Sequence, residues 1–243
     1  MWNNRRVLGY GEGNKILNNP ASFKIIVPIY DEFDNLKEFI KLLQDKNTDI
    51  SRFLFVNNGS LDKNISDLLV KNSLNYITSE VNLGFGGGIK LGISNVTSNY
   101  VCWMPCNLKV SPVDVLNFIK EIKVPKENSL YKAIRSERPQ IDNIKTLIFS
   151  FVQSLLLNSY IYDSGGTPTM VHRKFFENFD NFPNDYTFET YVMLKAKYSN
   201  FKIERLRVKY GKRKYGKSHW QNGLLTEIQF IKNMYTSSKN WKF

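Results

Sequence analysis

The sequence predicts an α/β fold with a mostly parallel central sheet flanked by helices in a single domain. Short apolar runs of strand length alternate with segments whose apolar residues recur at helical spacing. The length of 243 residues fits one such domain. With 42% hydrophobic and 14% aromatic residues, the composition is ordinary for a protein that buries a core.

In the first half of the chain, strands and helices are expected in strict alternation. The expected strands are Phe23–Tyr30, Arg52–Val56, Leu74–Ile77 and Tyr100–Trp103. The expected helices are Asp34–Gln44, one from about Asp62, one that begins with Gly88–Ser94, and Pro112–Ile122. Asp34 or a neighbour suits the N-cap of the first helix, and Pro112 suits the first turn of the last. Crossovers of this kind place consecutive strands parallel.

The second half is less regular. Tyr131–Ile134, Thr167–His172 and Phe201–Val208 are expected to be extended. Helices are expected at Ile141–Leu157, Asp185–Tyr198 and Gly223–Tyr235, with a basic loop at Lys209–Ser218.

The longest apolar stretch is Thr146–Tyr162, and polar residues interrupt it, so it is not expected to span a membrane. Its apolar residues share one helical face. We expect this face to pack on the core. The alternative is a helix lying in the plane of a membrane, because several basic residues are close in sequence. These are Lys132, Arg135, Arg138 and Lys145.

The chain carries 34 Lys and Arg against 22 Asp and Glu, a formal net charge of +12. This surplus favours an anionic partner such as nucleotide phosphates, acidic lipid or nucleic acid. No RNA-binding signature accompanies it, so nucleic acid is not among the expected partners. Cys102 and Cys106 form a lone C-x3-C pair, which lacks the ligand number of a zinc site. Buried thiols and a polar segment at residues 1–19 without a signal-peptide core favour the cytoplasm.

Ligands of doubly wound sheets bind beyond the carboxyl ends of the strands, where the strand order reverses. The segments expected there are Tyr30–Glu32, Asn57–Ser60 and Pro105–Asn107. Further motifs follow in order along the chain. They are NLGFGGGIKLG at residues 82–92, DSGG at 163–166, HRKFF at 172–176 and RKYGKSHW at 213–220.

Together with FKIIVPIYDE at residues 23–32 and FVNNGSLD at 55–62, this ordered series resembles the motifs of family 2 glycosyltransferases. The resemblance implies a GT-A (Rossmann-like) domain over residues 22–236. It implies an N-terminal extension at 1–21 and a C-terminal tail at 237–243. Within the family, the chain is most similar to the branch of the dolichyl-phosphate mannosyltransferase group, without that group's membrane helices.

The resemblance places the nucleoside of a sugar donor beside Pro28, Tyr30, Glu32, Asn57 and Asn58. Asn57 stands where the family carries an acidic residue, and an amide can still bond a base edge. The alternative for this segment is a plain turn, because Asn and Gly tolerate left-handed backbone. Gly84 and Gly86 either expose backbone N–H groups to an anion or meet the geometry of a tight connection.

Pro105, Cys106 and Asn107 align with the family's DXD site, which is degenerate here because it has no carboxylate. Mg²⁺ and Mn²⁺ prefer carboxylate oxygens, so we assign no metal ligand and expect metal binding to be weak or absent. The charge of the leaving diphosphate would then be neutralised by basic side chains. The candidates are Lys109, Arg135, Arg138, Arg213, Lys214 and Lys217.

The resemblance points to Asp185, Glu189 and Asp163 as catalytic candidates. A carboxylate near residues 185–189 would deprotonate an acceptor hydroxyl, whereas a lipid phosphate needs no base. The alternatives are helix capping for Asp185, a solvated face for Glu189 and turn capping for Asp163. Ser218 and His219 follow the basic loop and are candidates for donor binding. The resemblance places His219 at the diphosphate or at a metal, and the alternative is an exposed histidine with neither role.

These features favour a hexosyltransferase-type enzyme that moves a sugar from a UDP or GDP donor with inversion. The expected acceptor is a polyprenyl phosphate or a lipid-linked or surface glycan. A peripheral contact with an anionic membrane at its inner face is also expected. The alternative is a catalytically inactive homologue that acts as a binding or scaffold protein, which the missing carboxylates favour.

Overall fold

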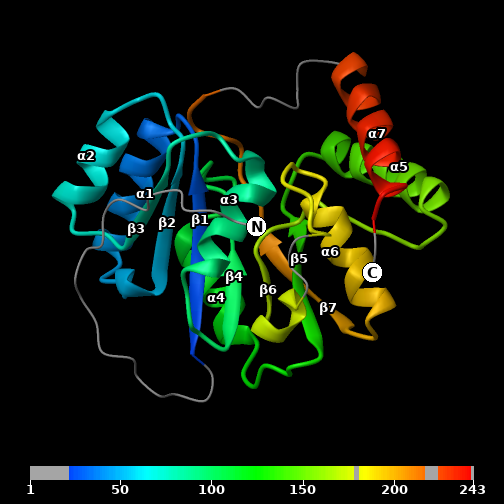
Figure 1. Ribbon diagram of the computed structural model, residues 1–243, viewed down its shortest axis with the longest axis horizontal. Helices are drawn as coiled ribbons and strands as arrows, with labels where there is room; N and C mark the ends of the chain where they lie inside the picture. The colour runs from blue at the N-terminus through cyan, green and yellow to red at the C-terminus, as the bar shows by residue number, and fades with distance from the viewer. Residues whose placement is uncertain (1–21, 178–180, 217–223, 242–243) are drawn as a thin grey trace.

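Strands and helices alternate along the chain (Figure 1) in a computed structural model that describes residues 22–177, 181–216 and 224–241. The strands are β1 (Phe23–Ile29), β2 (Phe53–Asn58), β3 (Tyr76–Ser79), β4 (Tyr100–Trp103), β5 (Ser129–Ser136), β6 (Thr169–His172) and β7 (Lys202–Lys209). The α-helices are α1 (Phe33–Asp45), α2 (Asn64–Lys71), α3 (Gly84–Ser94), α4 (Pro112–Glu121), α5 (Gln140–Leu156), α6 (Phe188–Tyr198) and α7 (Leu224–Ser238). Short 3-10 turns lie at η1 (Ile50–Arg52) and η2 (Arg173–Phe176).

The described strands form one seven-stranded sheet in the order β3-β2-β1-β4-β6-β5-β7. Only β6 runs against its neighbours β4 and β5, and all other pairs within the described residues are parallel. The mostly parallel α/β sheet predicted from the sequence is therefore confirmed. The strand order reverses between β1 and β4, and this is where such sheets bind ligands.

Pro28 lies where β1 and β4 separate. Pairing between these strands ends at Ile26 opposite Trp103, followed by one bond from Met104 N to Ile26 O. Residue 28 faces the same side of the strand as residue 26, and proline has no N–H to donate. Its place in a central strand therefore costs no ladder bond, because the ladder with β4 has already ended.

The two faces of the sheet carry separate apolar cores. Ile25, Val27 and Ile29 of β1 face α1, α2 and α4. Ile26 points the other way and joins the core formed with α3 and α6. This alternation follows from the two-residue period of a strand, and it shows that β1 is buried on both sides.

Some element boundaries differ from the sequence expectation. Helix α3 starts at Gly84 rather than Gly88, because the glycines form its first turn. Helix α6 starts at Phe188 and not at Asp185. Glu32, not Asp34, is the N-cap of α1, and its side chain makes no capping bond. Helix α7 runs to Ser238, beyond the end expected at Tyr235.

The expectation that the apolar face of α5 packs on the core is wrong. Leu147, Ile148, Phe151 and Leu155 are all exposed, with Leu155 at 71%. Polar side chains of the same helix are buried instead. None of the helices in the described part of the chain is both long and apolar enough to span a bilayer.

Replacement of Gly92 by Ala tests the packing of α3 on the sheet. An added Cβ would lie well inside van der Waals contact of Ile26 Cγ2 on the buried strand β1. We expect a net loss of about 1–2 kcal/mol in unfolding free energy, because overpacking outweighs the gain in helix propensity. Urea denaturation measures the change. Ser94→Ala, at an exposed position of the same helix, is the control and should stay within about 0.5 kcal/mol. Equal effects of the two variants would contradict this packing.

Candidate active site

Asp31 joins the carboxyl ends of β1 and β2. Its backbone is left-handed, with φ of 50°, and its N–H donates to Ser60 Oγ over 3.2 Å. Its Oδ1 accepts hydrogen bonds from the N–H groups of Leu61, at 2.8 Å, and Asp62, at 3.2 Å. The turn after β2 is thus fixed beside Tyr30, which is partly buried. This corner is where the resemblance places the nucleoside.

Asn57 and Asn58 are each 3% exposed and bond to the surrounding protein. Asn57 donates to Ser66 Oγ, at 3.0 Å, and accepts from Ser60 N, at 3.2 Å. Asn58 donates to Gly84 O, at 3.0 Å, and accepts from Leu83 N, at 3.2 Å. Both amides therefore join neighbouring segments in the wall of the site. A carboxylate at either position could not donate these hydrogen bonds.

The amides at the start of α3 already have acceptors. Gly84 N donates to Asn82 Oδ1, Gly86 N to Asp185 O and Gly87 N to Asn184 O. A Cβ on Gly84 or Gly86 would collide with the backbone of residues 183–185. Of the two alternatives for these glycines, the contacts favour the tight connection, because close backbone approach accounts for both residues.

A loop after β7, residues 210–216, lies over the ends of β1 and β4. Arg213 pairs with Glu32, Lys214 pairs with Glu38 at 2.7 Å, and Gly211 N donates to Lys109 O over 2.7 Å. Burial raises the pKa of the Glu32 carboxyl, and the Arg213 charge opposes this shift only in part. Lys217, Ser218 and His219, which are candidates for donor binding, lie outside the described residues.

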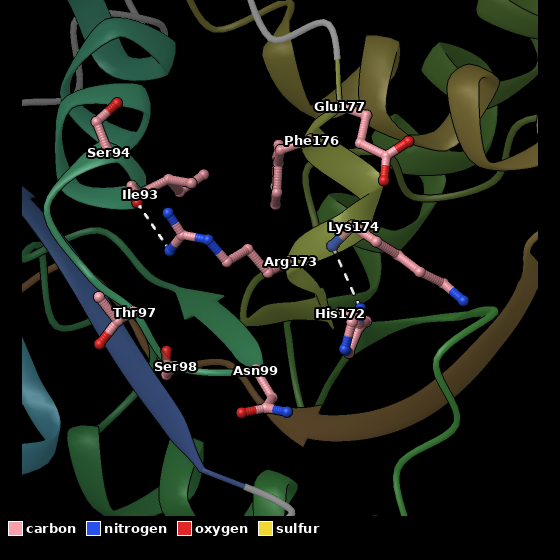
Figure 2. A pocket seen from close by; sticks show the side chains of 10 residues that line it. All are labelled: Ile93, Ser94, Thr97, Ser98, Asn99, His172, Arg173, Lys174, Phe176 and Glu177. Atoms are coloured by element: carbon pink, nitrogen blue, oxygen red, sulfur yellow. Dashed lines mark hydrogen bonds between the residues drawn. The ribbon is translucent and has the colours of Figure 1, made fainter. Parts of the chain in front are cut away.

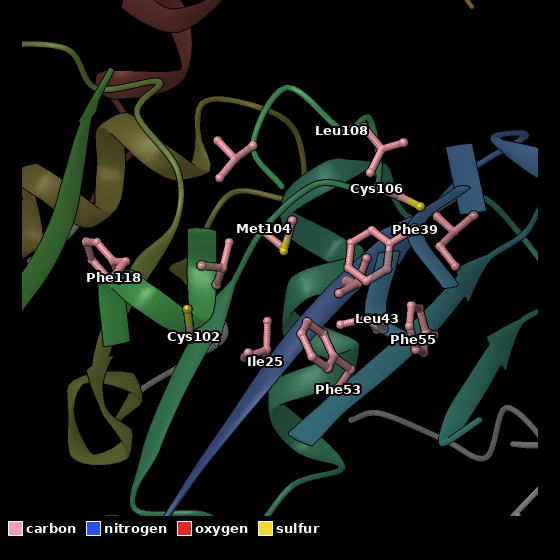
Figure 3. Close-up of a cluster of buried hydrophobic side chains, with 14 of the residues drawn as sticks. Ile25, Phe39, Leu43, Phe53, Phe55, Cys102, Met104, Cys106, Leu108 and Phe118 are labelled. Carbon is pink, nitrogen blue, oxygen red and sulfur yellow. The ribbon is translucent and has the colours of Figure 1, made fainter. Parts of the chain in front are cut away.

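Alternate side chains of the segment after β4 point into the core. Cys106 is fully buried in the cluster that contains Met104 and Leu108 (Figure 3). Cys102 and Cys106 are free and buried, as expected, and burial raises the pKa of both thiols. Both stay protonated near neutral pH. Asn107 Oδ1 accepts from Lys109 N over 3.1 Å, which turns the amide towards its own loop.

These donors do not fit a divalent cation. The segment supplies a protonated thiol, an amide already in use and no carboxylate, whereas Mg²⁺ and Mn²⁺ require hard oxygen ligands. Over the part of the chain that the structure describes, no three His, Cys, Asp or Glu side chains gather as a metal site.

Lys109, Arg135, Arg138 and Arg213 form a cation cluster at the same edge. Burial, then repulsion from Arg135 and Arg213, lowers the pKa of Lys109. Burial and Arg135 likewise lower the pKa of Arg138. Within the described residues, Lys109 Nζ has no hydrogen-bond or ion-pair partner, and Arg138 Nε is buried without one. The cluster holds more positive charge than its surroundings neutralise, which suits an anionic ligand.

Asp163 is the main counter-ion of this cluster. It is 1% exposed, and its Oδ1 accepts from Arg135 Nε over 2.6 Å while Oδ2 accepts from Arg135 N. Burial acts to raise the pKa of Asp163, but Arg135 outweighs it, so the pKa lies below its usual range. The carboxylate fixes Arg135 and is buried from solvent.

Glu189 lies in a second buried network. Its Oε2 pairs with Lys132 Nζ at 2.6 Å, and its Oε1 accepts from Trp103 Nε1 at 2.7 Å. Lys132 also donates to Thr169 Oγ1. At 6% exposure Glu189 is not on a solvated face, so that alternative is wrong. The sequence analysis missed Lys132 as its partner, although a lysine within an apolar strand signals a buried charge.

Asp185 is the most accessible of the catalytic candidates. It is partly exposed just before α6, and its Oδ1 accepts from Thr187 N and Oγ1 at 2.8 and 2.6 Å. It therefore shapes the turn into α6 without being the N-cap, which is Thr187. Its backbone contact with α3 places it at the carboxyl edge of the sheet.

A hollow of about 580 Å³ lies at the opposite, amino-terminal edge of the parallel strands (Figure 2). It is lined by residues before β4 and by η2. Arg173 donates there to the carbonyls of Ile93 and Val96, and Lys174 pairs with Glu127. Its cations are already partnered, so the carboxyl edge remains the candidate site.

The sequence profile described as Glycosyl transferase family 2 matches residues 24–199, well over half of the chain. The chain belongs to this glycosyltransferase family. No match is found among curated protein sequences. The family assignment agrees with the GT-A fold described above.

Solved structures resemble this glycosyltransferase in fold. One is glucosyl-3-phosphoglycerate synthase of Mycobacterium tuberculosis with Mn²⁺, UDP-glucose and phosphoglyceric acid. It has 10% identity and a TM-score of 0.64, over 92% of this chain and 81% of that one. The same enzyme with Mn²⁺, UDP and glucosyl-3-phosphoglycerate has 11% identity and a TM-score of 0.62, over 88% and 76%. A mycobacterial protein has 15% identity and a TM-score of 0.65, over 90% and 74%.

Replacement of Asp163 by Asn in this glycosyltransferase tests the buried pair with Arg135. Removing one partner leaves a buried charge, so we expect unfolding free energy to fall by about 3–5 kcal/mol. Because the native pKa of Asp163 is lowered, its contribution is complete above the unfolded pKa and is lost as the pH falls through the native value. As the pH falls below 5, the unfolding free energy of the variant should therefore change less than that of the wild type. Denaturation curves over this range measure it, and an unchanged pH slope would contradict the assignment.

Proposed function

We propose that the protein transfers a hexosyl group, with inversion, from a UDP- or GDP-sugar to a polyprenyl phosphate. A lipid-linked or surface glycan is the other candidate acceptor in this class. The chain would act at the inner face of a membrane in the building of a cell-envelope polysaccharide. Within the family we assign it to the branch of the dolichyl-phosphate mannosyltransferase group.

The observation that carries this proposal is the cation cluster of Lys109, Arg135, Arg138 and Arg213. It lies beside the point where β1 and β4 separate, so a ligand bound there meets unneutralised positive charge. Both partners of the proposed reaction are anionic, one a nucleoside diphosphate and the other a phosphate. The family match and the UDP complexes of the structural neighbours support a nucleotide-sugar donor.

The donor nucleoside would bind at the corner of Asp31 and the turn after β2. Asp31 holds that turn through its Oδ1, so its other carboxylate oxygen is the group that could accept from ribose hydroxyls or a base. Lys109 and Arg213, whose loops meet at the bond from Gly211 N to Lys109 O, would take the diphosphate. Charge that develops on the departing nucleoside diphosphate would be stabilised by these fixed cations.

Transfer to a phosphate acceptor would not require removal of a proton from the acceptor. A phosphate oxygen is already a nucleophile at neutral pH, so no base is needed. If the acceptor is a hydroxyl, Asp185 is the carboxylate we propose as the base, because Glu189 and Asp163 are held in buried ion pairs.

The second candidate is a catalytically inactive homologue that binds a nucleotide or a glycan. The observation that favours it is the use of Glu189 and Asp163 in buried pairs, together with the absence of carboxylates at residues 105–107. Such a protein would respond to nucleotides without consuming the sugar donor.

A thermal-shift panel of UDP, GDP, CDP and their sugars, with manganese or with EDTA, tests donor binding. We expect UDP or GDP to stabilise the protein equally in EDTA, by about 2.7 kcal/mol at a hundredfold excess over Kd. No response to any nucleotide would sink the proposal. Donor binding without transfer to added polyprenyl phosphate would favour the inactive homologue.

Replacement of Lys109 by Gln tests the cation cluster. We expect nucleotide affinity to fall about tenfold, because a charge-assisted contact is lost. The protein without ligand should be no less stable, since Lys109 is repelled by the neighbouring arginines. Lys120→Gln on the exposed side of α4 makes the same charge change elsewhere and should leave affinity unaltered. Titration calorimetry measures both, and equal losses would contradict a local role.

The variants Asp185→Asn and Glu189→Gln distinguish the roles of the two carboxylates. With a hydroxyl acceptor, Asp185→Asn should lower kcat by about 10²–10⁴ while nucleotide-induced stabilisation remains. With a phosphate acceptor, kcat should hardly change. Glu189→Gln should reduce unfolding free energy by about 3–5 kcal/mol, because Lys132 is left buried without its counter-ion. A stable but inactive Glu189→Gln variant would instead make Glu189 the base.

A further inference from the structure

Helix α5 turns its polar side chains towards the protein and its apolar side chains towards solvent. The side that faces the protein is polar, with Thr146, Ser150 and Gln153 buried. The opposite side forms an exposed apolar stripe with helical spacing and no charged residue within it. The stripe consists of Ile141, Ile144, Leu147, Ile148, Phe151 and Leu155, each at least half exposed.

Hydrogen bonds hold α5 in this orientation. Ser150 Oγ accepts from Asp163 N over 3.0 Å. Gln153 donates to Thr190 Oγ1 at 2.9 Å and accepts from Ser164 Oγ at 2.8 Å. Rotating the helix to bury the stripe would break all of these bonds. The stripe is therefore a fixed surface feature, and monomers rarely expose apolar patches without a binding role.

We propose that the exposed stripe of α5 docks on an anionic lipid bilayer, with the helix lying in the plane of the interface. Covering large apolar side chains is favourable in proportion to the apolar area removed from water. Phe151 would enter the acyl boundary, and Tyr160, 75% exposed just beyond the helix, suits the headgroup level.

Charge complementarity selects an anionic lipid surface over a second copy of the chain. Lys145 lies on α5 beside the stripe, and exposed Lys232 lies on α7, which packs on α5 through Phe149 and Phe230. Figure 1 shows α7 lying across α5. The chain carries +12 in total, so a symmetric dimer through this face would oppose like charges. A negative membrane surface attracts Lys145 beside the stripe.

Docking in this way would bring the lipid close to the cation cluster. Thr146 Oγ1, on the protein side of α5, accepts from Arg138 at 3.1 Å and Arg135 at 3.3 Å. The cluster and the stripe are therefore separated by about one helix diameter, roughly 10–12 Å. A phosphate carried on a lipid in that bilayer would lie about one helix diameter from Arg135 and Arg138, with α5 between them. This last step rests on the proposed function, whereas the docking itself does not.

Vesicle flotation of the full chain tests the docking. The vesicles are pure phosphatidylcholine or an equal mixture of phosphatidylglycerol and phosphatidylcholine. The wild type should float with the mixed vesicles, less with the neutral ones, and less in high salt. The double variant Phe151→Asp, Leu155→Asp should bind the mixed vesicles at least about tenfold more weakly. Val124→Asp, at an exposed apolar residue between α4 and β5, is the control and should bind like the wild type.

Each contrary result overturns the inference. Failure of the wild type to float with mixed vesicles excludes lipid docking, and an unchanged double variant excludes α5 as the surface. If light scattering shows a dimer that the double variant dissociates, and vesicles do not bind, the face is a self-interface. Nucleotide thermal shifts on the same proteins distinguish a failure of the proposed function from a failure of lipid docking. Flotation without any nucleotide response would refute the transferase and leave the docking surface standing.

Discussion

The architecture of the site depends on the separation of β1 from β4. Pro28 cannot donate a ladder bond, and the pairing of these strands ends before it, at Ile26 and Trp103. The chain then leaves the sheet, buries Cys106 in the core and delivers Lys109 to the carboxyl edge. The gap between the two strands and the position of Lys109, the first cation of the cluster, therefore both follow from one break in a parallel ladder.

Charge in this site is arranged in an uncommon way. The acidic residues Asp163 and Glu189 are deep in the protein and hold Arg135 and Lys132 in place. The accessible carboxylates of the site are Asp31 and Asp185, while the cations of the cluster lie at the edge that would face a ligand. A neutral Asn57 or Asn58 both donates and accepts, which lets it tie β2 to the loops around it. The result is a site whose anion affinity would come from side chains and not from a bridging metal ion.

The fold could be predicted because its signals are local. Period-two and helical patterns gave the sheet and most helices, and the ordered motifs gave the family. The orientation of α5 could not be predicted, because an apolar stripe does not say which side of a helix meets the protein. Its anchors are Asp163, Ser164 and Thr190, residues from other elements. In the same way, Glu189 pairs with Lys132, which is 57 residues away in the sequence, and bonds to Trp103, which is 86 residues away. Such pairings depend on tertiary structure.

The contact between α3 and the segment before α6 has a consequence for motion. The bonds from Gly86 N and Gly87 N to the carbonyls of residues 185 and 184 join main-chain atoms only. These bonds need no side-chain partner, and they hold the backbone of Asp185 against the first turn of α3. The loop at residues 210–216 is tied to the start of α1 by side chains, through Arg213 to Glu32 and Lys214 to Glu38. Opening of the site for substrate entry would thus fall to this loop, the part whose ties a competing anion can replace.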